Sequence, residues 1–262
     1  MTNYSGRYIV INGTGVPIQD AQCLHQCGPN LNTTMISVPS LANGEATEAC
    51  TLTSEEGRND YWTPIFKAGK VIFARPGKQC NVEEEDTGGL CLIALYNCVF
   101  SIIPPVSSYC LLNYYSAFID RDCAALSGGE DQQPVHSDGI KKVPGEGVNE
   151  DYDGSFIVIN ATNGPITDVQ VIHTCDGKSQ PFGPDRMAID AVSPLIRTTS
   201  ARWSSDHWKV SFRNAAGQLK LRDGKRCDYT PPEAQYICMI ILYANDFSIA
   251  PIRDGCYHNY YG

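Results

Sequence analysis

The chain has 262 residues, with 29 acidic and 20 basic side chains and a formal net charge of −9. Acidic residues outnumber basic ones in both halves, so neither half has the basic excess that binding to a phosphate backbone needs, and nucleic acid is not expected as a partner. No apolar run approaches the roughly 20 residues that a membrane-spanning helix requires, so membrane insertion is not expected either.

The chain contains an internal duplication with a period of about 147 residues. Residues 8–12 (YIVIN) return as 156–160 (FIVIN), and both copies end on Cys-x-x-Asn-Tyr-Tyr, at 110–115 and 256–261. A period this long indicates two tandem domains, because the repeats of a solenoid run to roughly 20–50 residues. The duplication also lets one copy serve as a comparison for the other.

We expect the first domain at residues 1–116 and the second at 153–262. The intervening residues 117–152 are rich in Gly, Pro and charged groups and contain few large apolar ones, which is typical of a linker. Its start, residues 117–126, is expected to form one or two helical turns packed on the first domain.

Short apolar runs that are rich in β-branched and aromatic residues, and bounded by Gly, Pro, Asn and Asp, indicate strands. In the second copy these runs are, in chain order, 156–160, 169–175, 195–201, 207–214, 218–222, 236–243 and 247–249. Residues 209–213 and 218–222 alternate with period two on either side of a turn, which predicts a hairpin with one buried face. Residues 238–242 are continuously apolar, as in a central strand buried on both faces.

About seven strands in about 110 residues predict an all-β fold of two tandem, disulfide-stapled, β-sandwich-like domains. Residues 186–191 also fit a short helix that Asp185 would start. If such helices form, the alternative is an α+β sandwich.

The chain has 12 cysteines, which favours an oxidising destination and predicts an extracellular protein. The first residues lack the basic and apolar regions of a signal peptide, so we expect a mature chain or unconventional export. Four cysteines recur in each copy: Cys27, Cys80, Cys91 and Cys110 in the first, and Cys175, Cys227, Cys238 and Cys256 in the second.

Cys227 and Cys238 flank a turn-rich segment, so we expect them to pair, which leaves Cys175 for Cys256. The same choice in the first copy gives the pairs Cys80–Cys91 and Cys27–Cys110. Four cysteines allow three pairings, so the other two stay open. Four more cysteines belong to the first half alone and are left unassigned: Cys23, Cys50, Cys98 and Cys123.

Two repeated aromatic elements are candidate ligand-binding sites. The first is an Asp-aromatic-Trp element, with Asp60 and Trp62 in the first copy and Asp206 and Trp208 in the second. An indole stacks on the apolar face of a sugar while a neighbouring carboxylate accepts bonds from its hydroxyls. The alternative, which we favour for both tryptophans, is that they are core residues of a small β-domain. Trp203 has no counterpart in the first copy and is expected at the surface.

The second element is the Asn-Tyr-Tyr ending of each copy. Neighbouring residues on a strand face opposite sides, so one tyrosine of each pair is expected to be exposed, where it would serve as an efficient contact residue. The alternative is that this aromatic end closes the sandwich. The candidate binding residues are Asn113, Tyr114, Tyr115, Asn259, Tyr260 and Tyr261.

Cys23, His25 and Cys27 share one face of a predicted strand and have residue types that can ligate zinc. The second copy has Val171 in place of Cys23, which removes one ligand. We therefore interpret His25, and with it His173, as a structural histidine beside a cystine, and expect no metal and no cofactor.

No nucleophile elbow, Walker loop or zinc-protease motif is present in the sequence. Tandem duplication raises avidity when two copies of a weak site engage one surface, and gives an enzyme no comparable gain. The sequence therefore predicts a non-catalytic, carbohydrate-binding, lectin-like protein with glycans or glycoproteins as partners, and a homodimer is compatible with it. The alternatives are a secreted protein-binding effector or inhibitor and, ranked below it, a secreted hydrolase.

Overall fold

The computed structural model describes residues 2–28, 32–96, 99–106, 110–114, 151–201, 205–229, 237–250, 256 and 259–262. The helical turns expected at 117–126, nearly all of the expected linker, and Cys98, Cys123 and Trp203 lie outside these residues. Within them the chain is almost entirely β-strand, and its single helical segment is the 3-10 turn Glu84–Asp86. This confirms the predicted all-β fold. None of the described residues form a helix long and apolar enough to cross a bilayer.

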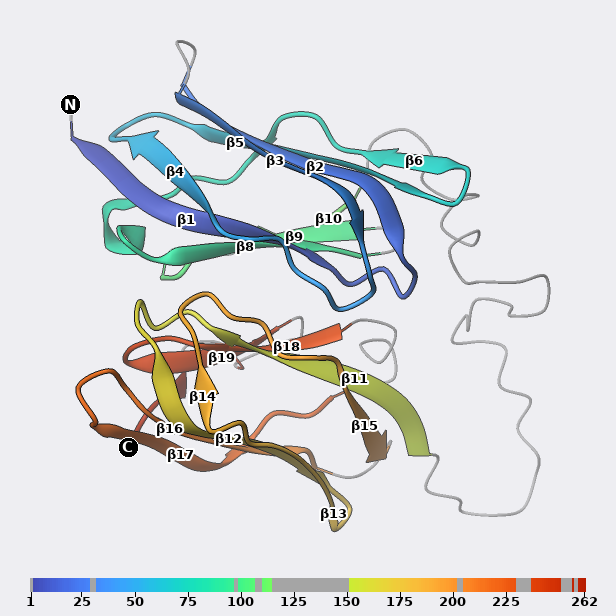
Figure 1. Ribbon diagram of the computed structural model, residues 1–262, viewed down its shortest axis with the longest axis vertical. Helices are drawn as coiled ribbons and strands as arrows, with labels where there is room; N and C mark the ends of the chain where they lie inside the picture. Colours follow the sequence, from blue (N-terminus) through green and yellow to red (C-terminus); the bar gives the residue numbers. More distant parts are fainter. Residues whose placement is uncertain are drawn as a thin grey trace.

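The first repeat is a sandwich of two five-stranded sheets (Figure 1). The first inner sheet has the order β10-β9-β8-β1-β4, with β1 (Asn3–Asn12), β4 (Cys50–Glu55), β8 (Leu90–Leu95), β9 (Val99–Ile103) and β10 (Cys110–Tyr114). The first outer sheet has the order β3-β2-β5-β6, with β7 also paired to β5, and comprises β2 (Ile18–Cys27), β3 (Asn32–Leu41), β5 (Asp60–Ala68), β6 (Val71–Ala74) and β7 (Lys78–Gln79).

The second repeat has the same construction. The second inner sheet has the order β15-β11-β18-β19-β20, with β11 (Asp151–Asn160), β15 (Ile196–Ala201), β18 (Ile237–Leu242), β19 (Asp246–Ala250) and β20 (Asn259–Tyr260). The second outer sheet has the order β13-β12-β16-β17, with β14 also paired to β12, and comprises β12 (Ile166–Cys175), β13 (Lys178–Phe182), β14 (Arg186–Met187), β16 (His207–Arg213) and β17 (Leu219–Arg226). In both repeats the first strand pairs in parallel with a central strand, β1 with β8 and β11 with β18.

The runs predicted as strands in the second repeat all contain strands, and the predicted hairpin is β16–β17. The short helix expected at 186–191 is wrong. Residues Arg186 and Met187 instead pair with β12, and the Asn160 side chain donates hydrogen bonds to the carbonyls of Met187 and Ala188. Asp190 has a φ of 57°, in the left-handed region that ends a right-handed helix. The helix therefore does not form, because pairing with β12 and hydrogen bonds to the buried Asn160 side chain hold this segment in another conformation.

The central strands of both inner sheets are apolar on both faces. Every residue of β8 and β18 is buried. Because side chains alternate along a strand, Ile240 points into the core of its own sandwich while Met239 and Ile241 point the other way. The predicted central strand buried on both sides is thereby confirmed.

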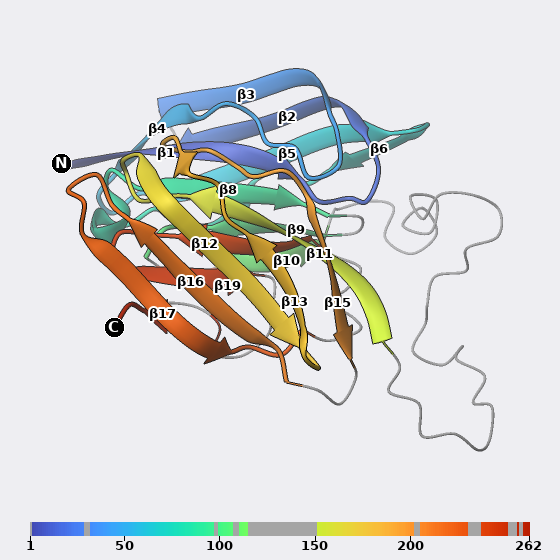
Figure 2. The ribbon, with the colours of Figure 1, turned by 60° about the horizontal axis from the view of Figure 1, so that its bottom comes forward.

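The outward faces of the two inner sheets pack against each other, so the molecule has four layers, with the two outer sheets on the outside (Figures 1 and 2). The buried residues of this central contact come about equally from the two repeats: Ile9, Ile11, Leu90, Leu92, Ala94, Tyr96, Val99, Ile103, Ile157, Ile159, Ala161, Ile237, Met239, Ile241, Tyr243 and Ala250. The two sandwiches therefore share one apolar contact and form a single body.

A polar lock crosses the same contact on one side. Arg7 Nε donates to Asp190 Oδ2 at 2.7 Å, and Arg7 Nη2 donates to Asp190 Oδ1 at 3.1 Å and to Asn163 Oδ1 at 2.8 Å. Asp190 and Asn163 both have positive φ, 57° and 65°, which short polar side chains tolerate better than most.

The lock has no counterpart on the opposite side. The positions equivalent to Asp190 and Asn163 in the first repeat are Gly44 and Gly15, and the position equivalent to Arg7 in the second is Ser155. The first repeat therefore supplies the cation and the second supplies the acceptors. Two identical repeats packed in this way would lack the ion pair altogether.

We predict that Arg7 and Asp190 are energetically coupled. A double-mutant cycle of Arg7→Met and Asp190→Asn, measured by urea unfolding, should give a coupling of about 1.5 kcal/mol or more, because a bidentate, partly buried pair is shielded from water. The matched control is Arg226 and Asp228, a pair on the open surface with side chains 64 % and 42 % exposed, for which we expect less than about 1 kcal/mol. Equal couplings in the two cycles would contradict a role for Arg7 in joining the repeats.

Candidate functional site

A buried polar cluster lies at one end of the first sandwich. His25 Nε2 hydrogen-bonds Asp60 Oδ1 at 2.7 Å, Ser54 Oγ donates to Asp60 Oδ2 at 2.7 Å, and the Val82 backbone N–H donates to the same oxygen at 2.9 Å. The side chains of His25 and Asp60 have no exposed surface. The carboxylate therefore has its hydrogen bonds satisfied within the protein, as a buried charge requires.

The second repeat keeps the same cluster. His173 Nε2 hydrogen-bonds Asp206 Oδ1 at 2.6 Å, and Ser200 and the backbone of Tyr229 also donate to this carboxylate. Thr198 contacts the other ring nitrogen of His173. In the first repeat Leu52 occupies that position, and His25 Nδ1 has no partner among the described residues.

This cluster stabilises the fold. It does not contain a serine hydrogen-bonded to a histidine that could act as its catalytic base. Ser54 and His25 both bond to Asp60 and not to each other, whereas a nucleophilic serine needs the histidine as its base. The described residues also bring no three His, Cys, Asp or Glu side chains together as metal ligands.

The Asp-aromatic-Trp elements belong to this interior. Trp62 and Trp208 are both fully buried, and their rings pack on His25 and His173 with centroids 4.4 and 4.3 Å apart. Each indole N–H donates to a cysteine carbonyl, that of Cys80 or Cys227. These side chains are therefore core residues. The expected surface platform for a sugar, built from Asp60, Trp62, Asp206 and Trp208, does not exist.

The expected disulfide pairing is wrong. Cys227 bonds Cys256, with Cα atoms 5.9 Å apart, and so pairs with neither Cys238 nor Cys175. Cys175 keeps its thiol, which accepts a bond from Ser200 Oγ at 3.5 Å. Cys227, Cys238 and Cys256 all border the same core, but Cys238 lies in the central strand β18 of the inner sheet, whereas Cys227 directly follows β17 of the outer sheet.

The first repeat follows the same logic. Cys80 is disulfide-bonded, while Cys27 and Cys91 keep their thiols, so the expected pairs Cys80–Cys91 and Cys27–Cys110 do not form. Burial raises the pKa of the Cys27 thiol, which lies 3.6 Å from Ser54 Oγ. His25 and His173 are therefore structural histidines beside buried thiols, and not beside cystines.

The Asn-Tyr-Tyr ending of the second repeat divides its residues between core and surface. Asn259 is buried and donates to the carbonyls of Phe247 and Cys256. Tyr261 packs on Phe212 and Phe247, and burial raises its pKa. Tyr260 is 67 % exposed.

In the first repeat Asn113 and Tyr114 lie in β10, but their side chains, like the whole of Tyr115, are outside the described residues.

A surface hollow of ≈ 450 Å³ lies along β15 and the start of β11. It presents a carboxylate, a guanidinium, an amide and hydroxyls beside one apolar side chain. Its lining residues are Asp153, Gly154, Ser155, Gln180, Leu195, Arg197, Thr198 and Thr199. Register explains the grouping: Asp153 lies opposite Thr199 and Ser155 opposite Arg197, so these four side chains share one face of the sheet.

Some surface charges of the second repeat are engaged within the protein, whereas the two charges of this hollow are not. Lys178, Arg213 and Arg226 each pair with an aspartate. Asp153 and Arg197, in contrast, make no side-chain hydrogen bond or ion pair with any described residue. Their hydrogen-bonding groups are therefore available to a ligand.

A second hollow of ≈ 510 Å³ adjoins the first, between the loop 42–47 of the first repeat and residues 190–195 of the second. Leu195 lines both hollows and is 37 % exposed. A Cβ placed on Gly44 would lie 3.2 Å from the Leu195 side chain, so the glycine allows this close approach between the repeats. The two hollows together form a depression that crosses the boundary between repeats.

The two charged groups of this hollow are specific to the second repeat, because the positions equivalent to Asp153 and Arg197 are Ser5 and Thr51 in the first. Comparison of the two copies does not reveal this hollow, because its residues are not retained in both. The sequence does carry one signal, because the polar stretch 151–155 directly precedes the apolar run 156–160. A strand that is polar along one half and apolar along the other is covered by the rest of the protein only along its apolar half.

No protein-family model matches the chain, and a search of curated proteins finds no relative.

We predict that the buried aspartate is essential to stability. Asp206→Ala should lower the free energy of unfolding by about 3–5 kcal/mol, because it leaves His173, Ser200 and a backbone N–H buried without their acceptor. The matched control is Asp223→Ala, which removes an exposed carboxylate on β17 that pairs with Lys209 at the surface and should cost less than about 1 kcal/mol. Similar losses for the two variants in urea unfolding would show that the cluster is not a structural centre.

Proposed function

We propose that the protein is a non-catalytic saccharide-binding protein whose site is the hollow along β15 and β11. The observation that carries this proposal is the set of unengaged polar side chains on one face, with Asp153 and Arg197 beside an amide and two hydroxyls. A carboxylate accepts hydrogen bonds from adjacent sugar hydroxyls, and a guanidinium donates several in a fixed plane.

Size and shape agree with a small glycan. Ligand sites of proteins span about 300–1,000 Å³ and combine a few placed polar groups with apolar surface. The hollow of ≈ 450 Å³ has the right size for one or two sugar rings, and Leu195 supplies the apolar surface on which a ring's C–H face rests. The adjoining hollow beside the loop 42–47 gives room for a longer chain to extend toward the first repeat.

The disulfides support a setting outside the cell. Cys227–Cys256 and the bonded Cys80 are features of proteins that fold in an oxidising compartment. We therefore propose glycans or glycoproteins outside the cell as partners.

The test is a glycan array followed by titration calorimetry with the best saccharide. Asp153→Asn and Arg197→Met are each expected to weaken binding about tenfold or more, because a hydrogen bond to a charged group contributes about 1.5–3 kcal/mol. Arg222→Met is the matched control, since Arg222 is an exposed arginine on β17 outside the hollow, and it should bind like the wild type.

Two outcomes would count against the proposal. A protein that binds no glycan, or one whose binding is unchanged by both hollow variants while urea unfolding shows them folded, would refute it. Binding of a deglycosylated protein that Arg197→Met abolishes would instead favour the alternative of a secreted protein-binding effector using the same hollow.

A further inference from the structure

Three cysteines of the first repeat have no counterparts in the second, and two of them, Cys23 and Cys50, lie within the described residues. Cys23 lies on β2 and is fully buried, Cys50 lies on β4 and is half-buried, and both are free thiols in this structure. The equivalent positions in the second repeat hold Val171 and Ile196, which both pack in the core of that sandwich. Two apolar positions of one core have therefore become two thiols in the other.

The two thiols lie on strands that face each other across the edge of the sandwich. Cα atoms of β2 and β4 come within 8 Å of one another. Cys27 Sγ and Ser54 Oγ are 3.6 Å apart, although both side chains are short. In the second repeat the next pair back along the strands, His173 and Thr198, is also in contact.

The pair Cys23 and Cys50 continues this series. Side chains on one face of a strand recur every second residue, so residues 27, 25 and 23 of β2 face residues 54, 52 and 50 of β4 in turn. Direct contact is observed for the first of these pairs, and for the equivalent of the second in the other repeat. The third pair is Cys23 with Cys50.

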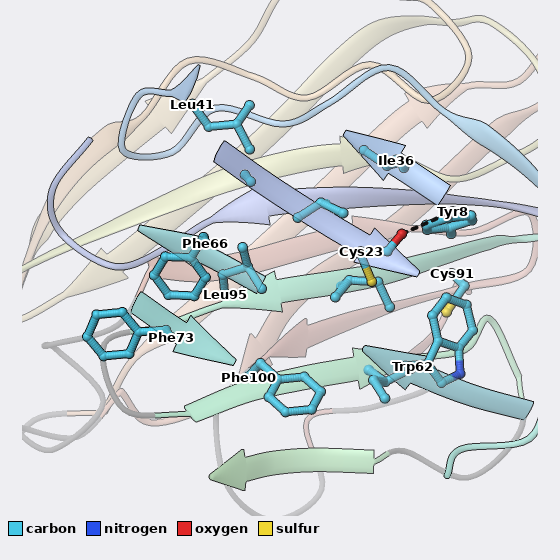
Figure 3. Packing of buried hydrophobic residues seen from close by; sticks show 14 of the residues in the cluster. Tyr8, Cys23, Ile36, Leu41, Trp62, Phe66, Phe73, Cys91, Leu95 and Phe100 are labelled. Carbon is cyan, nitrogen blue, oxygen red and sulfur yellow. Dashed lines mark hydrogen bonds between the residues drawn. The ribbon is translucent and has the colours of Figure 1, made fainter. Parts of the chain in front are cut away.

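Tyr8 gives an independent observation of the same neighbourhood. Tyr8 lies on β1 in register with Cys50 of the neighbouring strand β4. Its hydroxyl donates to the Cys23 carbonyl at 3.2 Å (Figure 3). The pKa of Tyr8 is raised by burial and also by the nearby thiols of Cys23 and Cys50. One phenol group therefore borders both cysteines, whereas the second repeat has Phe156 at this position.

We propose that Cys23 and Cys50 form a disulfide, unique to the first repeat, when the chain folds under oxidising conditions. The oxidant is a small disulfide such as oxidised glutathione. The thiolate of one cysteine attacks it and releases one glutathione thiolate. The second cysteine then attacks the mixed disulfide and releases the other, so two protein thiols lose two protons and two electrons, and one glutathione disulfide becomes two thiols.

The bond forms during folding and not afterwards. Cys23 is fully buried in the folded protein, and burial raises the pKa of its thiol, so the attacking thiolate is scarce once the core has closed. The bond ties β4 of the inner sheet to β2 of the outer sheet. β4 is an edge strand whose neighbour in its own sheet is β1, so this link holds the edge of the sandwich together.

Cys91 is the competing partner, because it also lies in register with Tyr8 and near Cys23. The second repeat keeps a cysteine there, Cys238, opposite Val171, so a thiol at this position does not depend on a partner across the core. Cys23 and Cys50, in contrast, are both replaced by apolar residues in the second repeat, Val171 and Ile196.

The test refolds the full chain in a glutathione redox buffer, blocks remaining thiols with iodoacetamide in denaturant, and maps the linked peptides without reduction. No Lys or Arg lies between residues 8 and 57, so trypsin leaves both cysteines on one peptide. Chymotrypsin with a Glu-specific protease separates them, at Leu24 and at Glu45 and Glu48. We expect a peptide pair joined through Cys23 and Cys50.

The matched control is the double variant Cys23→Val with Cys50→Ile, which takes its residues from the second repeat and so suits the same core. Under oxidising conditions the wild type should unfold several degrees above this variant, and the difference should disappear when both proteins are refolded with reducing agent. Alkylation of both cysteines in the oxidised protein, or a bond from Cys23 to Cys91, would overturn the proposal.

Discussion

The structure depends on two inner sheets whose central strands are apolar on both faces. A sheet in a two-layer sandwich normally has one buried and one solvated face, but here β8 and β18 are buried at every residue. Each sandwich fills one face of its inner sheet with its own core, and the other face is covered only by the other repeat. A single repeat would expose a contiguous apolar surface of the kind that drives association. The duplication is thus a structural necessity, and the pair of repeats is the folding unit.

The two repeats share this architecture but differ in individual side chains. The buried His–Asp pair and the tryptophan beside it are retained in both, which fits their role in holding each sandwich together. The changes occur where symmetry is not needed: a one-sided lock at Arg7, a pair of thiols in the first core, and an open polar hollow beside Arg197. Divergence of this kind changes the core of one repeat and the surface of the other while the shared contact stays intact.

Alternation and apolar runs predicted the fold well because they report which face of a strand is buried. The run 238–242 indicated a strand buried on both sides, and the alternation in 209–213 indicated a hairpin. The same patterns do not report which side chains meet across the space between two sheets. For this reason the pairing of Cys227 was predicted wrongly, and Asp60 and Trp62 were considered for the surface although a buried histidine lies against both. The hollow at Asp153 and Arg197 depends on β-register and on where the cover of a sheet stops, which neither composition nor spacing contains.

The central claim is that the two repeats unfold as one body because each covers the other's inner sheet. Differential scanning calorimetry of the full chain with its disulfides intact tests it most directly. The account predicts a single transition whose calorimetric and van't Hoff enthalpies agree for all 262 residues. Two separable transitions, each with the enthalpy of about half the chain, would contradict it, because they would mean that either sandwich stays folded with its apolar inner face exposed to water.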